Sequence, residues 1–201
     1  MFIQVVTGKI VDLEGFRREG DRWESVVKPA AEGHLGTTAG ATDDGTFFVA
    51  SRWDSAEAAA ANNDRPEQQA WFEGFAPTVK DVSYANCSEV VIMGEGGSDD
   101  AGFVQVMVGT IKDRAKFDAF KEQLDDMAAA FEDWRDDVIG DVMALHDDDD
   151  GFHDIIYFTS EAAARAGEQK EPTPEVMAFM SQMEDATDIV DYLDLSEPML
   201  R

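Results

Sequence analysis

His34 lies at the start of an expected strand and is one of three histidines in the chain. An imidazole titrates near neutral pH, so a histidine that reaches a ligand pocket can take a proton from a phenol or an enol. A lone histidine at such a place is more often a surface or strand-end residue. Val138 occupies the matching place in the second half of the chain, so any such proton transfer is confined to the first half.

Two glutamines are candidates for holding a polar group of a ligand. Gln4 and Gln105 each lie in the middle of an apolar strand pattern, at matching positions of the two halves. A buried amide must find hydrogen-bond partners, so each glutamine either stabilises the structure or lines a pocket.

Aromatic side chains near one another in the sequence could bind a flat ring. Trp53 ends a strand pattern, and a helical stretch shortly after it carries Trp71, Phe72 and Phe75. We expect these rings either to line an apolar pocket between sheet and helices or to form a packed core. Tyr157 is taken as the counterpart of Trp53 in the second half.

The segment from His146 to His153 places two imidazoles beside a run of four aspartates. The first half has Asp43, Asp44 and Gly45 at the matching turn, and the regular spacing of a calcium loop with a distal glutamate is absent. We therefore interpret the segment as a solvated hairpin turn and expect no metal site. Cys87 is the single cysteine, which excludes an intramolecular disulfide and favours a role in core packing.

The charge balance restricts the class of partner. The chain has 43 acidic and 16 basic residues and a formal net charge of -27. Such a surface repels phosphate backbones and anionic lipid headgroups, so no nucleic-acid or membrane partner is expected. The acidity is typical of a halophilic protein kept soluble at high salt, or of a protein from a generally acidic proteome. No leader segment, membrane span, glycine-rich phosphate loop or strand-elbow serine is found, and we expect a cytoplasmic location.

The elements that must position these side chains occur twice. Phe-Ile-Gln-Val-Val-Thr-Gly-Lys-Ile at 2–10 returns as Phe-Val-Gln-Val-Met-Val-Gly-Thr-Ile about 101 positions later. Asp12 and Phe16 match Asp113 and Phe117, and Gly36 matches Gly140. A repeat of this length indicates two whole domains related by duplication. We expect a first repeat at 1–93, a Gly/Ser/Asp-rich linker at 94–101 and a second repeat at 102–201.

Each half predicts the order β-α-β-β-α-β, which is the ferredoxin-like arrangement. The expected segments of the first half are a strand at 2–8, a helix at 12–32, hairpin strands at 34–41 and 46–53, helices starting near Ser55 and Pro66, and a strand at 81–93. Those of the second half are 102–110, 113–136, 138–146 and 152–158, helices from Ser160 and Pro174, and a strand at 187–195. The strands are apolar on both faces, so we expect the two sheets to pack face to face as in a dimer, within one chain. Further oligomerisation stays open.

The first half resembles a known family. Arg52-Trp53-Asp54-Ser55-Ala56-Glu57-Ala58, followed by Pro66 to Trp71 and by Phe75-Ala76-Pro77, is similar to the antibiotic biosynthesis monooxygenase-like domains of the dimeric α/β-barrel superfamily. The resemblance is weaker in the second half. It implies an α+β fold made of two ferredoxin-like repeats that form a single-chain barrel of the dimeric type.

The superfamily includes cofactor-free monooxygenases and haem-degrading enzymes. The haem-degrading members pair a strand-one amide and a strand-three tryptophan with a histidine on the next helix, and residues 56–80 contain no histidine. The lack of that histidine disfavours haem binding or degradation, which is kept as a third reading. The resemblance foremost implies a monooxygenase-like protein that acts on an aromatic or polyketide-like small molecule with no metal or other cofactor. Gln4, Trp53, Trp71 and Phe75 would bind the ring, with His34 as the candidate base. A non-catalytic ligand-binding or stress-associated protein is the alternative reading, because few titratable residues converge.

Overall fold

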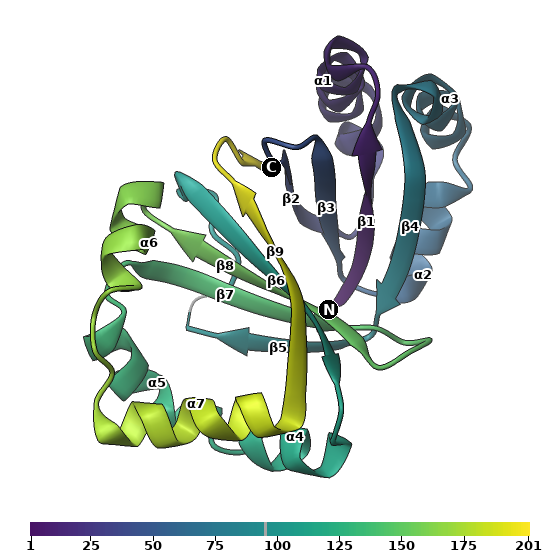
Figure 1. Cartoon of the computed structure of the whole chain (residues 1–201). Helices are drawn as coiled ribbons and strands as arrows, with labels where there is room; N and C mark the ends of the chain where they lie inside the picture. Colours follow the sequence, from purple (N-terminus) through teal and green to yellow (C-terminus); the bar gives the residue numbers. More distant parts are fainter. Residues whose placement is uncertain (95) are drawn as a thin grey trace. The chain divides into compact units, whose positions relative to one another are not determined.

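The computed structural model describes residues 1–94 and 96–201 and divides into two compact units (Figure 1). Unit 1 comprises Met1–Ser88 together with Met199–Arg201, and unit 2 comprises Glu89–Pro198. The expected ranges 1–93 and 102–201 differ from these units by one short strand each. The linker expected at 94–101 includes Glu95, which lies outside the described residues. None of the helices in the described residues is both long enough and apolar enough to span a bilayer.

Unit 1 has the expected order of elements, with one further strand from the far end of the chain. Helices α1, α2 and α3 lie on one face of its sheet (Figure 1). Its elements are β1 (Phe2–Ile10), α1 (Leu13–Arg22), β2 (His34–Ala41), β3 (Thr46–Trp53), α2 (Ala56–Asn63), α3 (Pro66–Phe75), β4 (Val79–Cys87) and β10 (Met199–Leu200).

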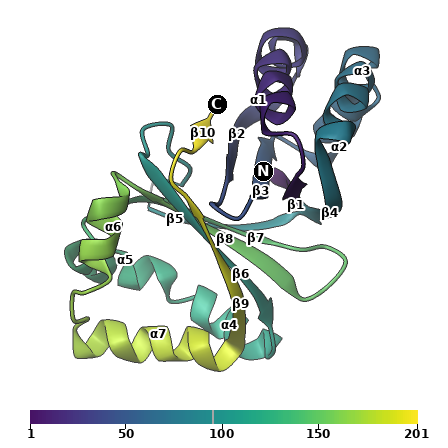
Figure 2. The same cartoon turned by 45° about the horizontal axis from the view of Figure 1, so that its top comes forward.

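Unit 2 repeats this order, and its helices again lie on one face of its sheet (Figure 2). Its elements are β5 (Glu89–Met93), β6 (Phe103–Ile111), α4 (Arg114–Lys121), α5 (Leu124–Trp134), β7 (Val138–Leu145), β8 (Gly151–Phe158), α6 (Glu161–Gly167), α7 (Pro174–Ala186) and β9 (Thr187–Leu195).

Local sequence signals start the helices at matching places in the two units. Asp12 accepts a hydrogen bond from the Gly15 amide and Asp113 accepts one from the Lys116 amide, so each aspartate is an N-cap. Ser55 and Ser160 cap α2 and α6 in the same way. These caps confirm the helix starts that the sequence predicts.

Both long helices differ from the expectation. The helix expected at 12–32 is α-helical to Arg22 and then continues as a π-helical turn, Trp23–Val27, and a 3-10 turn, Lys28–Ala30. The helix expected at 113–136 divides into α4 and α5. This break lets rings from both pieces contact Phe179 of α7, with centroid distances of 4.5 Å for Phe120 and 5.6 Å for Phe131.

The fifth strand of each sheet comes from the other half of the sequence. β5 follows the first half but joins the sheet of unit 2, and β10 follows the second half but joins the sheet of unit 1. The strand orders are β10-β2-β3-β1-β4 in unit 1 and β5-β7-β8-β6-β9 in unit 2. The strand expected at 81–93 is therefore two strands, β4 and β5, which belong to different sheets. Ser88-Glu89 lies at the start of β5, and Ser196-Glu197 lies just before β10. The same residue pair thus marks the beginning of both fifth strands.

Gly36 and Gly140, matched in the sequence, make room for these exchanged segments. A Cβ at Gly140 would collide with the carbonyl oxygen of Gly96, which follows β5. Gly36 has a φ of +148°, and its Cβ would lie 3.2 Å from the carbonyl oxygen of Arg201, at the end of β10. Only glycine avoids both the strained φ and the close approach.

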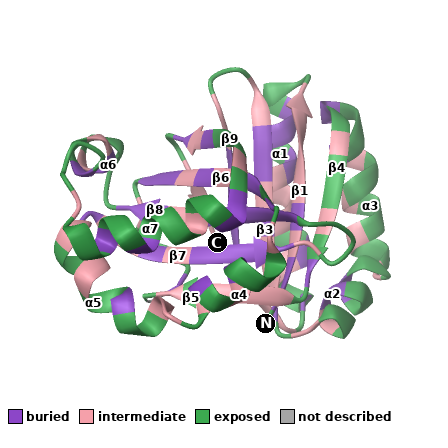
Figure 3. Ribbon diagram, turned by 60° about the horizontal axis from the view of Figure 1, so that its bottom comes forward, coloured by how far each residue is buried: buried purple, intermediate pink, exposed green. Residues whose placement is uncertain are grey.

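The strands alternate between two buried faces (Figure 3). In unit 1, Ile3, Val5, Phe48 and Ala50 on one face are all buried. The opposite face of the sheet meets the helices through a cluster that includes Phe16, Phe47, Phe75 and Val79. The expectation that these strands are buried on both faces is confirmed, and the helix side carries the site described next.

Candidate functional site

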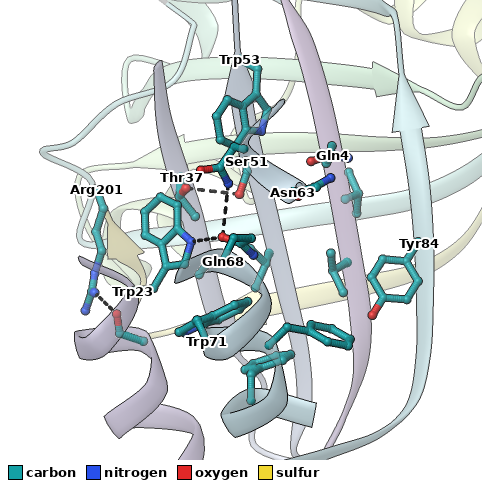
Figure 4. A pocket seen from close by; sticks show the side chains of 18 of the residues that line it. Gln4, Trp23, Thr37, Ser51, Trp53, Asn63, Gln68, Trp71, Tyr84 and Arg201 are labelled. Carbon is teal, nitrogen blue, oxygen red and sulfur yellow. Dashed lines mark hydrogen bonds between the residues drawn. The ribbon is translucent and has the colours of Figure 1, made fainter. Parts of the chain in front are cut away.

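A cavity of about 610 Å³ lies in unit 1 between the helix side of the sheet and the helical layer (Figure 4). Sheet residues form its floor, and α3, the end of α2 and the Trp23 turn form its walls. The exposed Phe72 and Tyr84 mark the side that faces solvent. This volume falls within the range of roughly 300–1,000 Å³ that is typical of small-molecule sites.

A row of polar side chains crosses the floor. Strand pairing places Thr37 opposite Ser51, Ser51 opposite Gln4, and Gln4 opposite Asn86. The Gln4 amide donates to Asn86 Oδ1 at 3.3 Å, and the hydroxyls of Thr37 and Ser51 lie 3.3 Å apart. The next row, in which Val6 and Val49 face each other, is apolar. The floor therefore offers hydrogen bonds along one edge and hydrophobic contact beside it.

Aromatic rings form the walls. Trp71 stacks on Phe75 with a centroid distance of 4.9 Å and an interplanar angle of 19°, and its indole N–H donates to the Glu19 carbonyl at 2.7 Å. Trp53 is 2% exposed and lines the cavity. Its indole N–H has no hydrogen-bond partner among residues 1–94 and 96–201. An unpaired buried donor is costly, so a ligand oxygen that accepts from it would bind favourably.

Side-chain amides hold the helical wall in place. Gln68 Oε1 accepts from the Trp23 indole N–H at 3.1 Å and from the Asn62 amide at 3.2 Å. The Arg65 guanidinium donates to Asn62 Oδ1 at 2.9 Å and to the Val27 carbonyl at 3.1 Å. Trp23 begins the π-helical turn, a distortion that occurs often at functional sites. Figure 4 shows Trp23 and Gln68 joined by their hydrogen bond at the edge of the cavity.

His34 lies on the helix side of the sheet, between Trp23 and Trp53, but does not line the cavity. Its ring has edge contacts with Trp23 at 4.9 Å and Trp53 at 5.1 Å, and its Nε2 lies 2.8 Å from the Thr37 hydroxyl. Burial, together with the nearby cations Lys28 and Arg52, lowers the pKa of His34 to about 4. The imidazole is therefore neutral at neutral pH, but it binds a proton too weakly to be an effective base there.

The exchanged strand β10 supplies one edge of the cavity. Met199 packs against the Phe16 cluster and lines the cavity together with Arg201. The backbone of Arg201 exchanges hydrogen bonds of 2.5 and 2.9 Å with Thr37. Its guanidinium donates to the Gly20 carbonyl at 2.8 Å and to Asp21 at 3.2 Å. Residues after the second repeat thus tie β2 to the end of α1.

Five of the candidates named from the sequence lie around this one cavity, namely Gln4, Trp53, Trp71, Phe72 and Phe75. Of the other three, His34 lies in unit 1 beside the cavity, and Gln105 and Tyr157 lie in unit 2. Gln105 donates to Asp194 at 2.9 Å. Gln4 and Gln105 thus each donate a hydrogen bond to the polar residue opposite them on the neighbouring strand. Gln4 also lines the cavity.

Tyr157 is not the counterpart of Trp53. Phe2 pairs with Trp53 in unit 1, and the matching Phe103 pairs with Phe158 in unit 2. A shift of one residue along a strand moves a side chain to the opposite face of the sheet. Tyr157 is buried on the face away from the helices, and Phe158 takes the place of the tryptophan.

Several residues around the cavity were not anticipated from the sequence. They are Trp23, Thr37, Ser51, Asn62, Asn63, Gln68, Gln69, Asn86, Met199 and Arg201. The amide pairs at 62–63 and 68–69 were a visible signal, because buried amides need hydrogen-bond partners and so point to a polar wall. Local sequence gave no signal for Met199 and Arg201, since strand exchange brings them to the cavity.

The two histidines of the acidic turn pair with each other. His146 Nε2 lies 3.0 Å from His153 Nδ1, and His146 Nδ1 lies 2.8 Å from Asp149 Oδ1. Within the described parts of the chain, no group of three or more His, Cys, Asp or Glu side chains is arranged to hold a metal ion. Hydrogen bonding within the turn accounts for the position of both imidazoles.

No protein-family model and no curated protein matches this sequence. Solved structures do resemble it over its whole length. A "putative monooxygenase" from Lactobacillus acidophilus has a TM-score of 0.73 at 12% identity and covers 100% of this chain and 98% of its own. One from Fusobacterium nucleatum has a TM-score of 0.74 at 11% identity, with 100% and 93% covered. An anthrone oxidase-like protein has a TM-score of 0.65 at 13% identity, with 100% and 92% covered.

These similarities show the fold. The chain is α+β and consists of two ferredoxin-like repeats in tandem. The resemblance noted in the sequence is thereby confirmed for the architecture. Identities of 11–13% do not extend it to an activity, because one fold of this kind supports many different functions.

Proposed function

We propose that unit 1 binds an aromatic or polyketide-like small molecule and acts on it as a cofactor-independent monooxygenase. The cavity between sheet and helices carries the proposal, because it combines ring-sized space, aromatic walls and a polar floor. Trp71 and Phe75 would contact the face of a flat ligand. The unpaired Trp53 N–H would donate to a ligand oxygen, and Gln4 and Ser51 would bind polar groups at the floor.

The reaction needs little acid–base chemistry from the protein. A phenolic substrate that forms a carbanion at a ring methylene can reduce dioxygen itself. One oxygen atom then enters as a carbonyl, and the other leaves as water with the two hydrogens of the methylene. The role of these residues is to exclude water, hold the ring in one orientation and stabilise negative charge on its oxygen.

A test begins with binding and continues with turnover. Anthrone is a suitable probe, because its oxidation to anthraquinone consumes one dioxygen per molecule. We expect the purified chain to bind anthrone in a thermal-shift assay and to accelerate oxygen uptake above the spontaneous rate. Trp53→Phe keeps a ring but removes the N–H, and we expect it to weaken binding about tenfold.

The matched control is Gln105→Leu in unit 2, compared with Gln4→Leu in unit 1. The proposal predicts that Gln4→Leu weakens anthrone binding and that Gln105→Leu does not. Equal effects of the two substitutions, or unchanged binding by Trp53→Phe, would contradict the assignment of the site to unit 1.

A non-catalytic binding protein is the second candidate, and one observation favours it. Among the described residues that line the cavity, the titratable side chains are Glu73, Tyr84 and Arg201, and they form no acid–base pair. Binding of anthrone without faster oxygen uptake would favour this function and reject catalysis.

A further inference from the structure

We propose that His34 is a positioning residue that acts on a ligand in the unit 1 cavity through Thr37 and Ser51. The inference rests on the proposed function, since it requires that the cavity bind a ligand carrying an oxygen. His34 would not act as a base. Because its ring does not line the cavity, it would act on the ligand through the side chains between them.

Three side chains form a continuous chain of hydrogen-bond contacts from the interior to the cavity floor. His34 Nε2 lies 2.8 Å from the Thr37 hydroxyl, which lies 3.3 Å from the Ser51 hydroxyl. Thr37 and Ser51 both line the cavity and face each other across β2 and β3. Figure 4 shows the contact between these two hydroxyls below Trp53.

A β-bulge brings His34 into this position. His34 pairs with Trp53 while Gly36 pairs with the adjacent Arg52, so Leu35 is an extra residue in β2. Bulges of this kind re-aim a side chain relative to regular alternation. The bulge places His34 on the same face as Thr37, and Leu35 is exposed.

The chain must have one direction, and His34 sets it. Lys28, Arg52 and Glu24 are the charged groups that act on the ring, and its pKa of about 4 keeps it neutral at neutral pH. One ring nitrogen then donates and the other accepts. If Nε2 donates to Thr37, then Thr37 donates to Ser51, and the Ser51 hydroxyl is left to donate to a ligand. The other tautomer leaves Ser51 free to accept.

The matching positions of unit 2 form no equivalent chain. Val138 pairs with Phe158 as His34 pairs with Trp53, and Asp141 and Ile156 take the places of Thr37 and Ser51. His34→Val therefore converts this position to the residue that the second repeat carries, in the same strand environment. That substitution is a natural test variant.

The experiment measures affinity by isothermal titration calorimetry at pH 7 with two probes, 1-naphthol and naphthalene. The wild-type chain is expected to bind 1-naphthol more tightly, since only this probe has an oxygen for Ser51. We expect His34→Val and Ser51→Ala each to weaken 1-naphthol binding about tenfold and the double variant to weaken it no further. Such non-additivity is the signature of residues that act as one unit. His34→Gln, which retains a polar nitrogen and oxygen, should restore part of the loss.

Naphthalene binding separates positioning from a general structural role. We expect it to be unchanged by His34→Val, whereas a collapsed cavity would weaken both probes. Thr37→Val breaks the chain of hydrogen bonds but keeps the His34 imidazole between Trp23 and Trp53. This variant replaces His34→Val in the test if His34→Val does not fold. Ring ¹⁵N shifts should show one neutral tautomer of His34 in the free protein.

Three outcomes would overturn the inference. Additive losses in the double variant would mean that His34 and Ser51 act separately. Equal wild-type affinity for 1-naphthol and naphthalene would show that the polar chain does not contribute to binding, although the aromatic cavity does. Binding of neither probe would reject the proposed function, and the role of His34 with it.

Discussion

The two repeats carry the same row of positions across their sheets but fill it differently. In unit 1 the row reads Thr37, Ser51, Gln4 and Asn86, and in unit 2 it reads Asp141, Ile156, Gln105 and Asp194. The glutamine and its bond to the fourth strand are shared. At the other three positions, carboxyl groups replace Thr37 and Asn86, and an aliphatic side chain replaces Ser51. The bond from the glutamine to the fourth strand is therefore a structural feature of both repeats, and the proposed site of unit 1 differs from unit 2 at the other positions of the row.

The helical layers diverge in the same way. Counted back from the residue that precedes β4 or β9, Gln68 corresponds to Val176, Trp71 to Phe179 and Phe75 to Met183. Val176 and Phe179 are buried in a large core cluster with Phe117, Phe120 and Phe152. Unit 2 thus packs aliphatic and aromatic side chains where unit 1 places amides and indoles around a cavity. After a duplication, one copy can supply stability while the other keeps space for a ligand.

The largest effect should come from truncating the matched rings of α3 and α7. Phe179→Ala should destabilise unit 2 by about 4 kcal/mol, because the ring is buried and stacked on Phe120 at 4.5 Å. Trp71→Ala should cost unit 1 less, since its ring already borders open space. Hydrogen exchange of the β8 and β3 amides reports the two units separately. Equal losses would show that the cavity side is packed as tightly as unit 2.

A second effect concerns Asp141 and Asp154, two neighbouring carboxyl groups of unit 2. Burial, and then the neighbouring Asp154, raises the pKa of Asp141 well above its ordinary value, and burial raises the pKa of Asp154. The folded state therefore binds protons more tightly than the unfolded state, so stability falls as the pH rises above the ordinary carboxyl range. Asp141→Asn should stabilise unit 2 by about 2 kcal/mol at pH 7 and flatten this dependence.

Urea unfolding at pH 5, 7 and 9 measures that dependence. The control is Asp148→Asn in the exposed hairpin turn, which should leave the profile unchanged. A wild-type protein that becomes more stable from pH 5 to pH 9, with the same rise in Asp141→Asn, would show that this pair does not govern the pH response.

The smallest effect concerns the exchanged strand. Arg201→Met introduces the residue type that unit 2 has at the matching Met93, and it removes the bonds from the guanidinium to Gly20 and Asp21. We expect a loss of about 1 kcal/mol in the docking of β10. Faster hydrogen exchange of the Thr37 amide and weaker binding of anthrone would show that β10 is held less firmly. Unchanged exchange at Thr37 would mean that the backbone pairing alone holds β10 in place.

Part of the site was predictable because it lies within regular strands and helices. Gln4 and Trp53 occupy positions whose face follows from alternation along one strand, and the rings of α3 follow from helical spacing. Tyr157 shows where this reasoning fails. The two repeats differ in length between the caps and strands, and without the pairing register a one-residue error changed the face of the sheet. The position of His34 depended on a bulge that alternation does not reveal.

The sequence by itself determined the duplication, the element order and the helix starts, because caps, turns and alternation act over a few neighbouring residues. Asp12, Ser55, Asp113 and Ser160 cap helices from their own side chains, whatever lies elsewhere. Only the tertiary structure decided which sheet receives β5 and β10. A short strand pairs with any compatible edge, and the choice depends on packing between residues far apart in the chain. That choice brings Met199 and Arg201 to Thr37 and completes the cavity.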